Sequence, residues 1–148
     1  MIRLSLAASL LAALPLAAAE RQIQMKDLPA AVQQAVQQQT SGAEIKGISQ
    51  EKENGRMQYE VETRVAGKSR DLTFDGKGTL VEVEQEVDLD ALPSPARAAI
   101  EKRAAGGKIV KVESIARGGV IVAYEGAYTK GGRSHEVSVN ANGAPIKD

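Results

Sequence analysis

The sequence predicts an α+β protein made of two tandem repeats, each with one helix packed on an antiparallel sheet of about four strands. Three observations support this fold class. The chain matches itself at a nearly constant shift, each repeat opens with an apolar stripe of helical period, and the rest of each repeat alternates with period two. A length of 148 residues, of which 43% are hydrophobic, suits one or two small domains.

The first 19 residues have the three-part layout of a secretory signal peptide. A cationic start, Met1-Ile2-Arg3, precedes an uncharged run that ends in Ala17-Ala18-Ala19. An uncleaved anchor would need about 20 apolar residues, and Pro15 interrupts this run. We therefore expect residues 1–19 to be removed after Ala19, leaving a periplasmic or secreted chain without a transmembrane span.

The repeats are expected at residues 20–87 and 88–148. At a shift of 64, Leu28-Pro29 matches Leu92-Pro93, and after one inserted residue the shift becomes 65, so that Tyr59-Glu60 matches Tyr124-Glu125. Turn glycines align with turn glycines, as in Gly78 and Gly143. This agreement indicates that the two halves share one local plan.

Each repeat begins with a predicted helix. The apolar stripes recur at spacings of three and four, which places them on one helical face; their members are Leu28, Val32, Ala35 and Val36 in the first repeat and Ala96, Ala99, Ile100 and Ala104 in the second. Asp27 is expected to cap the first helix and Ser94, ahead of Pro95, the second. The second stripe is rich in alanine, so that helix can lie close to its sheet.

Strands are predicted at residues 45–50, 57–65, 68–75 and 79–87 of the first repeat, because apolar side chains there alternate with polar ones. Gly-containing turns separate them, and residues 88–90 form the connector. One repeat has little apolar area to bury, so the two are expected to pack together or join their sheets.

Composition excludes most catalytic and metal chemistry. The chain has no Cys and one His, which rules out thiolate sites and multi-imidazole metal sites. Nineteen basic and nineteen acidic residues give no basic excess for nucleic acid. Phosphate-loop and serine-nucleophile motifs are incomplete, and His135 is expected at a sheet edge or partly exposed rather than as a catalytic base. We expect neither enzymatic activity nor a cofactor.

Several segments together resemble the secreted bacterial PepSY-like family, which is grouped with proteins like the beta-lactamase inhibitor protein. They are a helix opened by Leu-Pro, then Tyr59-Glu60-Val61-Glu62, Gly67-Lys68, Phe74-Asp75-Gly76-Lys77-Gly78 and Val81-Glu82-Val83. The resemblance implies a tandem helix-and-sheet fold, a periplasmic or extracellular setting and a non-catalytic role in binding or inhibiting other proteins, with peptidases favoured. The partner would be another envelope protein.

One surface feature is a candidate partner-binding site. Glu82, Glu84 and Glu86 alternate with Val81, Val83 and Gln85, so a strand there carries three carboxylates on one face. They form either a solvated, charge-protected edge or an acidic strip that attracts a basic partner. The alternative function is binding of a small ligand or metal ion. If the three are exposed, replacing them with Gln leaves stability nearly unchanged.

Overall fold

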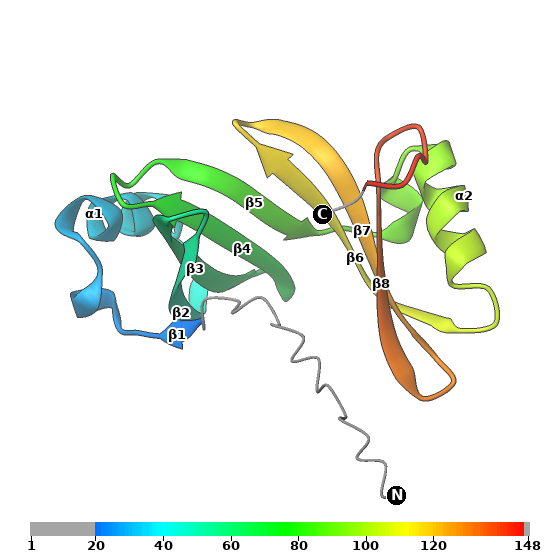
Figure 1. Cartoon of the computed structure of the whole chain (residues 1–148), viewed down its shortest axis with the longest axis horizontal. Helices are drawn as coiled ribbons and strands as arrows, with labels where there is room; N and C mark the ends of the chain where they lie inside the picture. Colours follow the sequence, from blue (N-terminus) through cyan, green and yellow to red (C-terminus); the bar gives the residue numbers. More distant parts are fainter. Residues whose placement is uncertain (1–19, 147–148) are drawn as a thin grey trace, which may run out of the picture.

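The computed structural model describes residues 20–146 and shows one antiparallel sheet of eight strands with two helices (Figure 1). The strands lie across the sheet in chain order: β1 (Arg21–Gln22), β2 (Glu44–Glu53), β3 (Arg56–Val65), β4 (Lys68–Asp75), β5 (Leu80–Glu86), β6 (Lys108–Arg117), β7 (Val120–Lys130) and β8 (Arg133–Val139). The helices α1 (Ala30–Gln39) and α2 (Ser94–Arg103) follow the 3-10 turns η1 (Met25–Asp27) and η2 (Leu89–Ala91).

The expected signal peptide, residues 1–19, and its cleavage point after Ala19 lie outside the described residues, so both stay predictions. Within residues 20–146, neither helix is long and apolar enough to cross a bilayer.

The expectation of two repeats, each with a helix on a sheet of about four strands, is wrong; of the two arrangements expected for the repeats, packing together or joining sheets, the structure has the joined sheet. Strand β5 pairs with β6, which places Glu82 opposite Arg117 and Glu86 opposite Glu113, so all strands form one sheet. The second half contributes three strands, β6, β7 and β8, instead of the expected four. Where a fourth strand was expected, after β8, the described chain forms an isolated bridge between Val139 and Pro145. A shared sheet also hydrogen-bonds two strand edges that separate sheets would leave open.

Helix α1 covers the first half of the sheet. Its buried residues Val32 and Val36 pack in a cluster with Val61, Leu72 and Phe74 from β3 and β4. The stripe predicted from helical spacing is therefore the contact with the sheet.

Helix α2 covers the second half and lies very close to it, as its alanine content predicts. Ala96 and Ile100 are fully buried against Val137 and Val139. A Cβ atom added to Gly126 on β7 would lie 2.5 Å from Cγ2 of Ile100. Glycine at this position therefore permits the close approach of the helix.

The same turn recurs in both halves, at the shift of 65 read from the sequence. Oδ1 of Asp75 accepts hydrogen bonds from the backbone N–H groups two and four residues later, and Oδ1 of Asn140 does the same. Gly78 and Gly143 have φ values of 82° and 79°, and an added Cβ at either would lie 2.5 Å from a helix carbonyl oxygen. Positive φ and this contact both require glycine.

Two predicted helix caps are wrong. Asp27 lies in η1, where its carboxylate accepts a hydrogen bond from the N–H of Gln24, and the residue before α1 is Pro29. Ser94 is the first residue of α2 and follows Pro93. In each case a Leu-Pro pair follows a 3-10 turn and directly precedes the helix, which begins at Ala30 in the first half and at Ser94 in the second.

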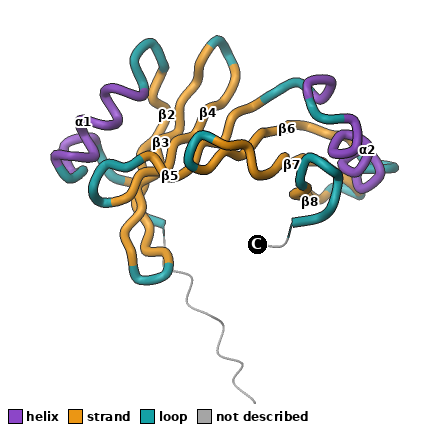
Figure 2. Tube along the Cα trace, turned by 90° about the horizontal axis from the view of Figure 1, so that it is seen from above, coloured by secondary structure: helices purple, strands orange, loops and turns teal. Residues whose placement is uncertain are grey.

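Both helices lie on one face of the sheet, at its opposite ends (Figure 2). Leu72 of the first cluster lies opposite Val83, and Val83 lies opposite Ala116 in the continuous register. Alternation from Ala116 leads to Val112 in the second cluster, on the same side. The side chains at the alternate positions of these strands therefore point to the other side of the sheet, which we call the helix-free face.

Candidate functional site

The predicted glutamates Glu82, Glu84 and Glu86 lie on the helix-free face, on the strand that joins the two halves of the sheet. The interpretation of this strand as an edge is wrong, because β5 is hydrogen-bonded to β4 on one side and to β6 on the other. All three residues are half-buried rather than exposed. They therefore lie in the middle of a surface.

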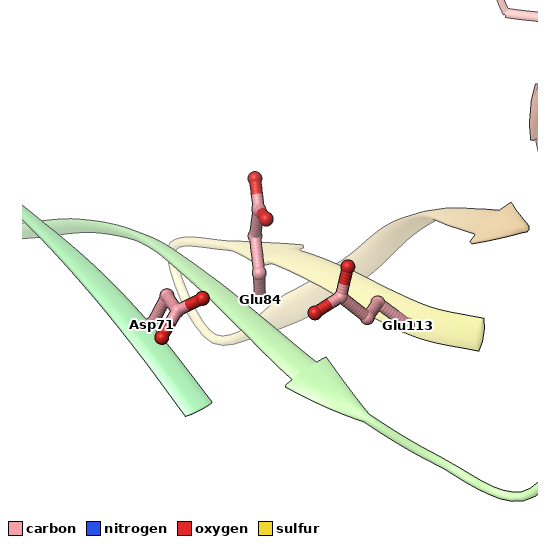
Figure 3. A group of neighbouring side chains, drawn as sticks. All are labelled: Asp71, Glu84 and Glu113. Atoms are coloured by element: carbon pink, nitrogen blue, oxygen red, sulfur yellow. The ribbon is translucent and has the colours of Figure 1, made fainter. Parts of the chain in front are cut away.

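The neighbouring strands add further carboxylates to the same surface. The register places Asp71 of β4 opposite Glu84, and Glu113 of β6 opposite Glu86. Ligand oxygens of Asp71, Glu84 and Glu113 all lie within 4.8 Å of one another. Figure 3 shows these three side chains, one from each of three neighbouring strands. We call Asp71, Glu84 and Glu113 the carboxylate cluster.

Sequence reasoning found Glu84 but missed Asp71 and Glu113. Each belongs to an alternating strand, so its face could be assigned only relative to its own strand. Which strands are neighbours decides whether the three carboxylates meet, and local alternation carries no information about that.

Burial and mutual repulsion raise the pKa of two carboxyl groups of the cluster, those of Glu84 and Asp71. Burial, followed by the charges of Glu113 and Glu82, raises the pKa of Glu84 to about 7. Burial also raises the pKa of Asp71, although the N–H of Thr63 opposes this by donating to its carboxylate. Near neutral pH, Glu84 is therefore partly protonated.

Glu113 is the most deeply buried member of the cluster, with 4% of its surface exposed. The Lys111 ammonium lies 2.9 Å from its Oε1, and the Ser69 hydroxyl donates to the same atom at 3.2 Å. Burial lowers the pKa of Lys111, but the hydrogen bond and charge of Glu113 outweigh this effect and leave the pKa raised. Lys111 and Ser69 thus stabilise a carboxylate that burial alone would disfavour.

Glu86 and Glu82 have partners of their own. The backbone N–H of Ser69 donates to Oε2 of Glu86 at 2.9 Å, and its hydroxyl lies 3.3 Å from the same oxygen. Arg117 forms a salt bridge with Glu82 across the β5–β6 pairing. Glu84, the remaining member of the predicted trio, lies instead beside Asp71 and Glu113 in the carboxylate cluster.

A hollow of about 400 Å³ lies over this surface, and we call it the acidic hollow. Its carboxylates come from β2, β3 and β5: Glu51, Glu53, Glu60, Glu82 and Glu84. Burial, and then the charge of Asp71, also raises the pKa of Glu60. The hollow therefore presents a concentration of negative charge that a cationic group could neutralise.

Two kinds of chemistry fit these groups. Carboxylate oxygens at this spacing suit a hard cation such as Ca²⁺, although Lys111 already supplies a positive charge to Glu113. Lys or Arg side chains of another protein would suit the same surface.

His135, on β8, is exposed, stacks on Tyr128 with ring centroids 5.2 Å apart, and lies on the helix side of the sheet.

Comparison with known proteins identifies relatives of this fold. A family model described as "Putative beta-lactamase-inhibitor-like, PepSY-like" matches residues 17–82 and again residues 57–126. A search of curated proteins finds no significant match.

Solved structures with the same fold come from Bacteroides species. A DUF2874 family protein of Bacteroides ovatus aligns with a TM-score of 0.60 and 16% identity, covering 81% of this chain and 85% of its own. A protein of Bacteroides eggerthii, described as periplasmic, gives 0.65 and 15%, covering 81% and 86%. A BLIP-like protein of Bacteroides fragilis gives 0.57 and 15%, covering 81% and 84%. The TM-scores show a shared fold at low sequence identity.

Proposed function

Because the chain belongs to the beta-lactamase-inhibitor-like, PepSY-like family, we propose that it is a periplasmic, non-catalytic module that binds another protein through its helix-free face. The setting is supported by the periplasmic description of the Bacteroides eggerthii structure and by the signal-like residues 1–19. The family description supports binding over catalysis.

The observation that carries this proposal is the acidic surface in the middle of the sheet. Glu82, Glu84 and Glu86 are half-buried beside Asp71 and Glu113, and burial raises the pKa of Glu84 to about 7. A cationic side chain docked here would favour the charged carboxylates and release a proton. Binding of a basic protein surface would therefore relieve electrostatic repulsion within the sheet.

The finer form of the proposal is that the module inhibits or regulates an envelope enzyme, with a peptidase as the favoured class. Such an enzyme would present a basic surface to the helix-free face. Complementary charge of this kind acts mainly on the association rate and on the choice of partner.

The test compares three forms of the chain that begins at Glu20: wild type, E82Q/E84Q/E86Q, and the matched control D88N/D90N/E101Q, whose positions are exposed and lie away from the acidic hollow. Each is immobilised and exposed to a periplasmic extract of the producing organism. We expect wild type and control to retain a stoichiometric protein that the triple Gln variant loses. Equal retention by all three forms, or retention of nothing, contradicts the proposal.

Inhibition is tested separately on the retained partner. If the partner is a peptidase, its hydrolysis of a fluorogenic peptide should fall when wild type is added in equimolar amount and should recover with E82Q/E84Q/E86Q. Full activity in the complex would leave a binding module without an inhibitory role.

A second candidate function is cation binding, which the spacing within the carboxylate cluster favours. Calorimetric titration of the metal-free protein with Ca²⁺ should then show one site that D71N/E84Q removes. The absence of saturable heat at millimolar Ca²⁺ would exclude this candidate.

A further inference from the structure

A second hollow lies beside the acidic hollow on the helix-free face. It has a volume of about 510 Å³, and its apolar lining comes from β6, β7 and the chain after β8: Ile115, Val122, Ala123 and Ile146. Glu53 and Arg117 line both hollows, so the two hollows adjoin at these side chains, and we call them together the groove. We call this second part the apolar hollow.

The apolar hollow leaves large hydrophobic side chains in contact with water. Val122 is 39% exposed and Ile146 is 37% exposed. Apolar area of this kind gains free energy when a partner covers it. Clustered exposed hydrophobic side chains beside a polar rim are typical of interaction sites.

The strand register makes the two chemistries direct neighbours. Glu84 of β5 lies opposite Ile115 of β6, and Ile115 lies opposite Ala123 of β7. Neighbouring strands are about 4.8 Å apart, so the change from carboxylate to aliphatic lining takes place over roughly 5 to 10 Å. Arg117, paired with Glu82, lies along the boundary between them.

This distance matches the repeat of an extended chain. Side chains at positions i and i+2 of a strand point the same way and are about 7 Å apart. A cation alone would satisfy only the acidic half, and an apolar ligand alone only the other half. A molecule that fills both hollows therefore needs a basic group in the acidic hollow and an apolar group in the apolar hollow.

We propose that the groove binds an extended segment of another protein in which Lys or Arg and a large apolar residue lie two positions apart. This inference rests on the proposed protein-binding function and specifies the chemistry of the bound segment. The basic side chain enters the acidic hollow beside Glu82 and Glu84, and the apolar side chain covers Val122 and Ile146 in the apolar hollow.

The test uses four synthetic octapeptides with blocked ends, each added to ¹⁵N-labelled protein and followed by NMR chemical-shift changes to millimolar concentration. One has Lys-Thr-Leu at its centre, one Lys-Thr-Ser, one Ser-Thr-Leu and one Thr-Lys-Leu, in which Lys and Leu point to opposite sides. We expect the Lys-Thr-Leu peptide to bind roughly tenfold more tightly than any other. Its shifts should be largest in β5, β6 and β7.

Two variants assign each end of the peptide to its hollow. In E82Q/E84Q, replacing Lys with Ser in the peptide should no longer weaken binding; in V122S/I146S, replacing Leu with Ser should no longer do so. Val110→Ser is the matched control, because Val110 is 55% exposed and lines neither hollow. If V122S/I146S does not fold, the four peptides on wild type still test the apolar half.

Three results would overturn the inference: no saturable shift for any peptide, equal affinity for all four, or a concentration-dependent dimer of wild type that V122S/I146S abolishes. The last would identify a second copy of the chain as the occupant. These results are distinguishable from failure of the proposed function. A partner retained through Glu82, Glu84 and Glu86 without any peptide selectivity would uphold the function and reject only this groove chemistry.

Discussion

At the scale of single residues, Glu113 shows how the sheet tolerates charge near its middle. Its carboxylate is buried, and the Lys111 ammonium at 2.9 Å and the Ser69 hydroxyl at 3.2 Å satisfy one of its oxygens. Removing the partner of a buried charge costs more than forming the pair gains, because the remaining charge stays desolvated.

Replacing Lys111 with Met should therefore destabilise the protein. Lys111 is 40% exposed, so solvent screening reduces the expected loss in the free energy of unfolding to about 1–2 kcal/mol. Urea denaturation at pH 7 measures this loss. Lys108→Met, at an exposed position of the same strand, is the control and should change stability by less than about 0.5 kcal/mol. Equal losses for both variants would contradict the role assigned to Lys111.

The raised pKa of Glu84 predicts how the stability of the protein depends on pH. Its pKa rises from an ordinary 4.5 to about 7 on folding, so the folded state holds a proton that the unfolded chain releases between these values. The stabilisation is complete below about pH 4.5 and is lost as the pH rises through about 7. Because Glu84 is half-exposed, we expect its contribution to span only about 1–2 kcal/mol.

Glu84→Gln removes this dependence. The free energy of unfolding of the variant, relative to wild type, should therefore be higher at pH 8 than at pH 5. Urea denaturation at both pH values measures this difference. Asp88→Asn, at an exposed position outside the cluster, controls for the loss of one negative charge. A difference between wild type and Glu84→Gln that does not change with pH would contradict the proposed titration.

At the scale of elements, the contact between α2 and β7 depends on a missing side chain. A Cβ on Gly126 would lie 2.5 Å from Cγ2 of Ile100, which is fully buried. Because Ile100 is packed in the core, a Cβ at position 126 would displace either the Ile100 side chain or α2 itself.

Gly126→Ala should therefore destabilise the protein by about 1–3 kcal/mol through overpacking. Thermal unfolding measures the loss, and the same substitution should cost less in an Ile100→Ala background, where the opposing methyl groups are absent. Gly76→Ala is the matched control, because no heavy atom lies within 4 Å of a Cβ there. Additive effects of Gly126→Ala and Ile100→Ala would show that the two positions do not interact.

At the scale of the whole molecule, the pairing of β5 with β6 produces a continuous face that neither half has alone. The acidic hollow takes its carboxylates from β2, β3 and β5, and the apolar hollow lies over β6, β7 and the chain after β8. The functional proposals concern this joined surface, not either half.

The association rate with a basic partner is the property most sensitive to this surface. E82Q/E84Q/E86Q should slow association roughly tenfold at low ionic strength and flatten its salt dependence, because long-range attraction is lost. Stopped-flow measurements across a salt series provide the test, with D88N/D90N/E101Q as control. Equal rates and salt slopes for wild type and the triple variant would remove these glutamates from recognition.

The half-burial of these glutamates also changes the predicted stability of E82Q/E84Q/E86Q. The sequence predicted little effect, on the premise that all three glutamates are exposed. All three are half-buried and the pKa of Glu84 is raised, so the Glu84→Gln change within this variant should increase stability at pH 8, and loss of the Glu82–Arg117 salt bridge should offset part of that gain. The premise was wrong because a strand that looks like a charged edge in isolation is a central strand of the joined sheet.

Local patterns in the sequence determined the elements of this protein. Helical spacing identified the stripe of Val32 and Val36, alternation identified β2 to β5 of the first half, and the shift of 65 predicted that the turns before Gly78 and Gly143 correspond. These predictions succeeded because residues a few positions apart decide helix, strand and turn geometry.

Only the tertiary structure decided that β5 pairs with β6, that Asp71, Glu84 and Glu113 meet, and that the acidic and apolar hollows adjoin. Each depends on which strands become neighbours. Alternation assigns the two faces of one strand but leaves its partner open, because every antiparallel neighbour offers the same backbone hydrogen bonds. The sequence by itself therefore determined the parts and their buried faces, and the pairing of distant strands decided the surface on which the proposed function rests.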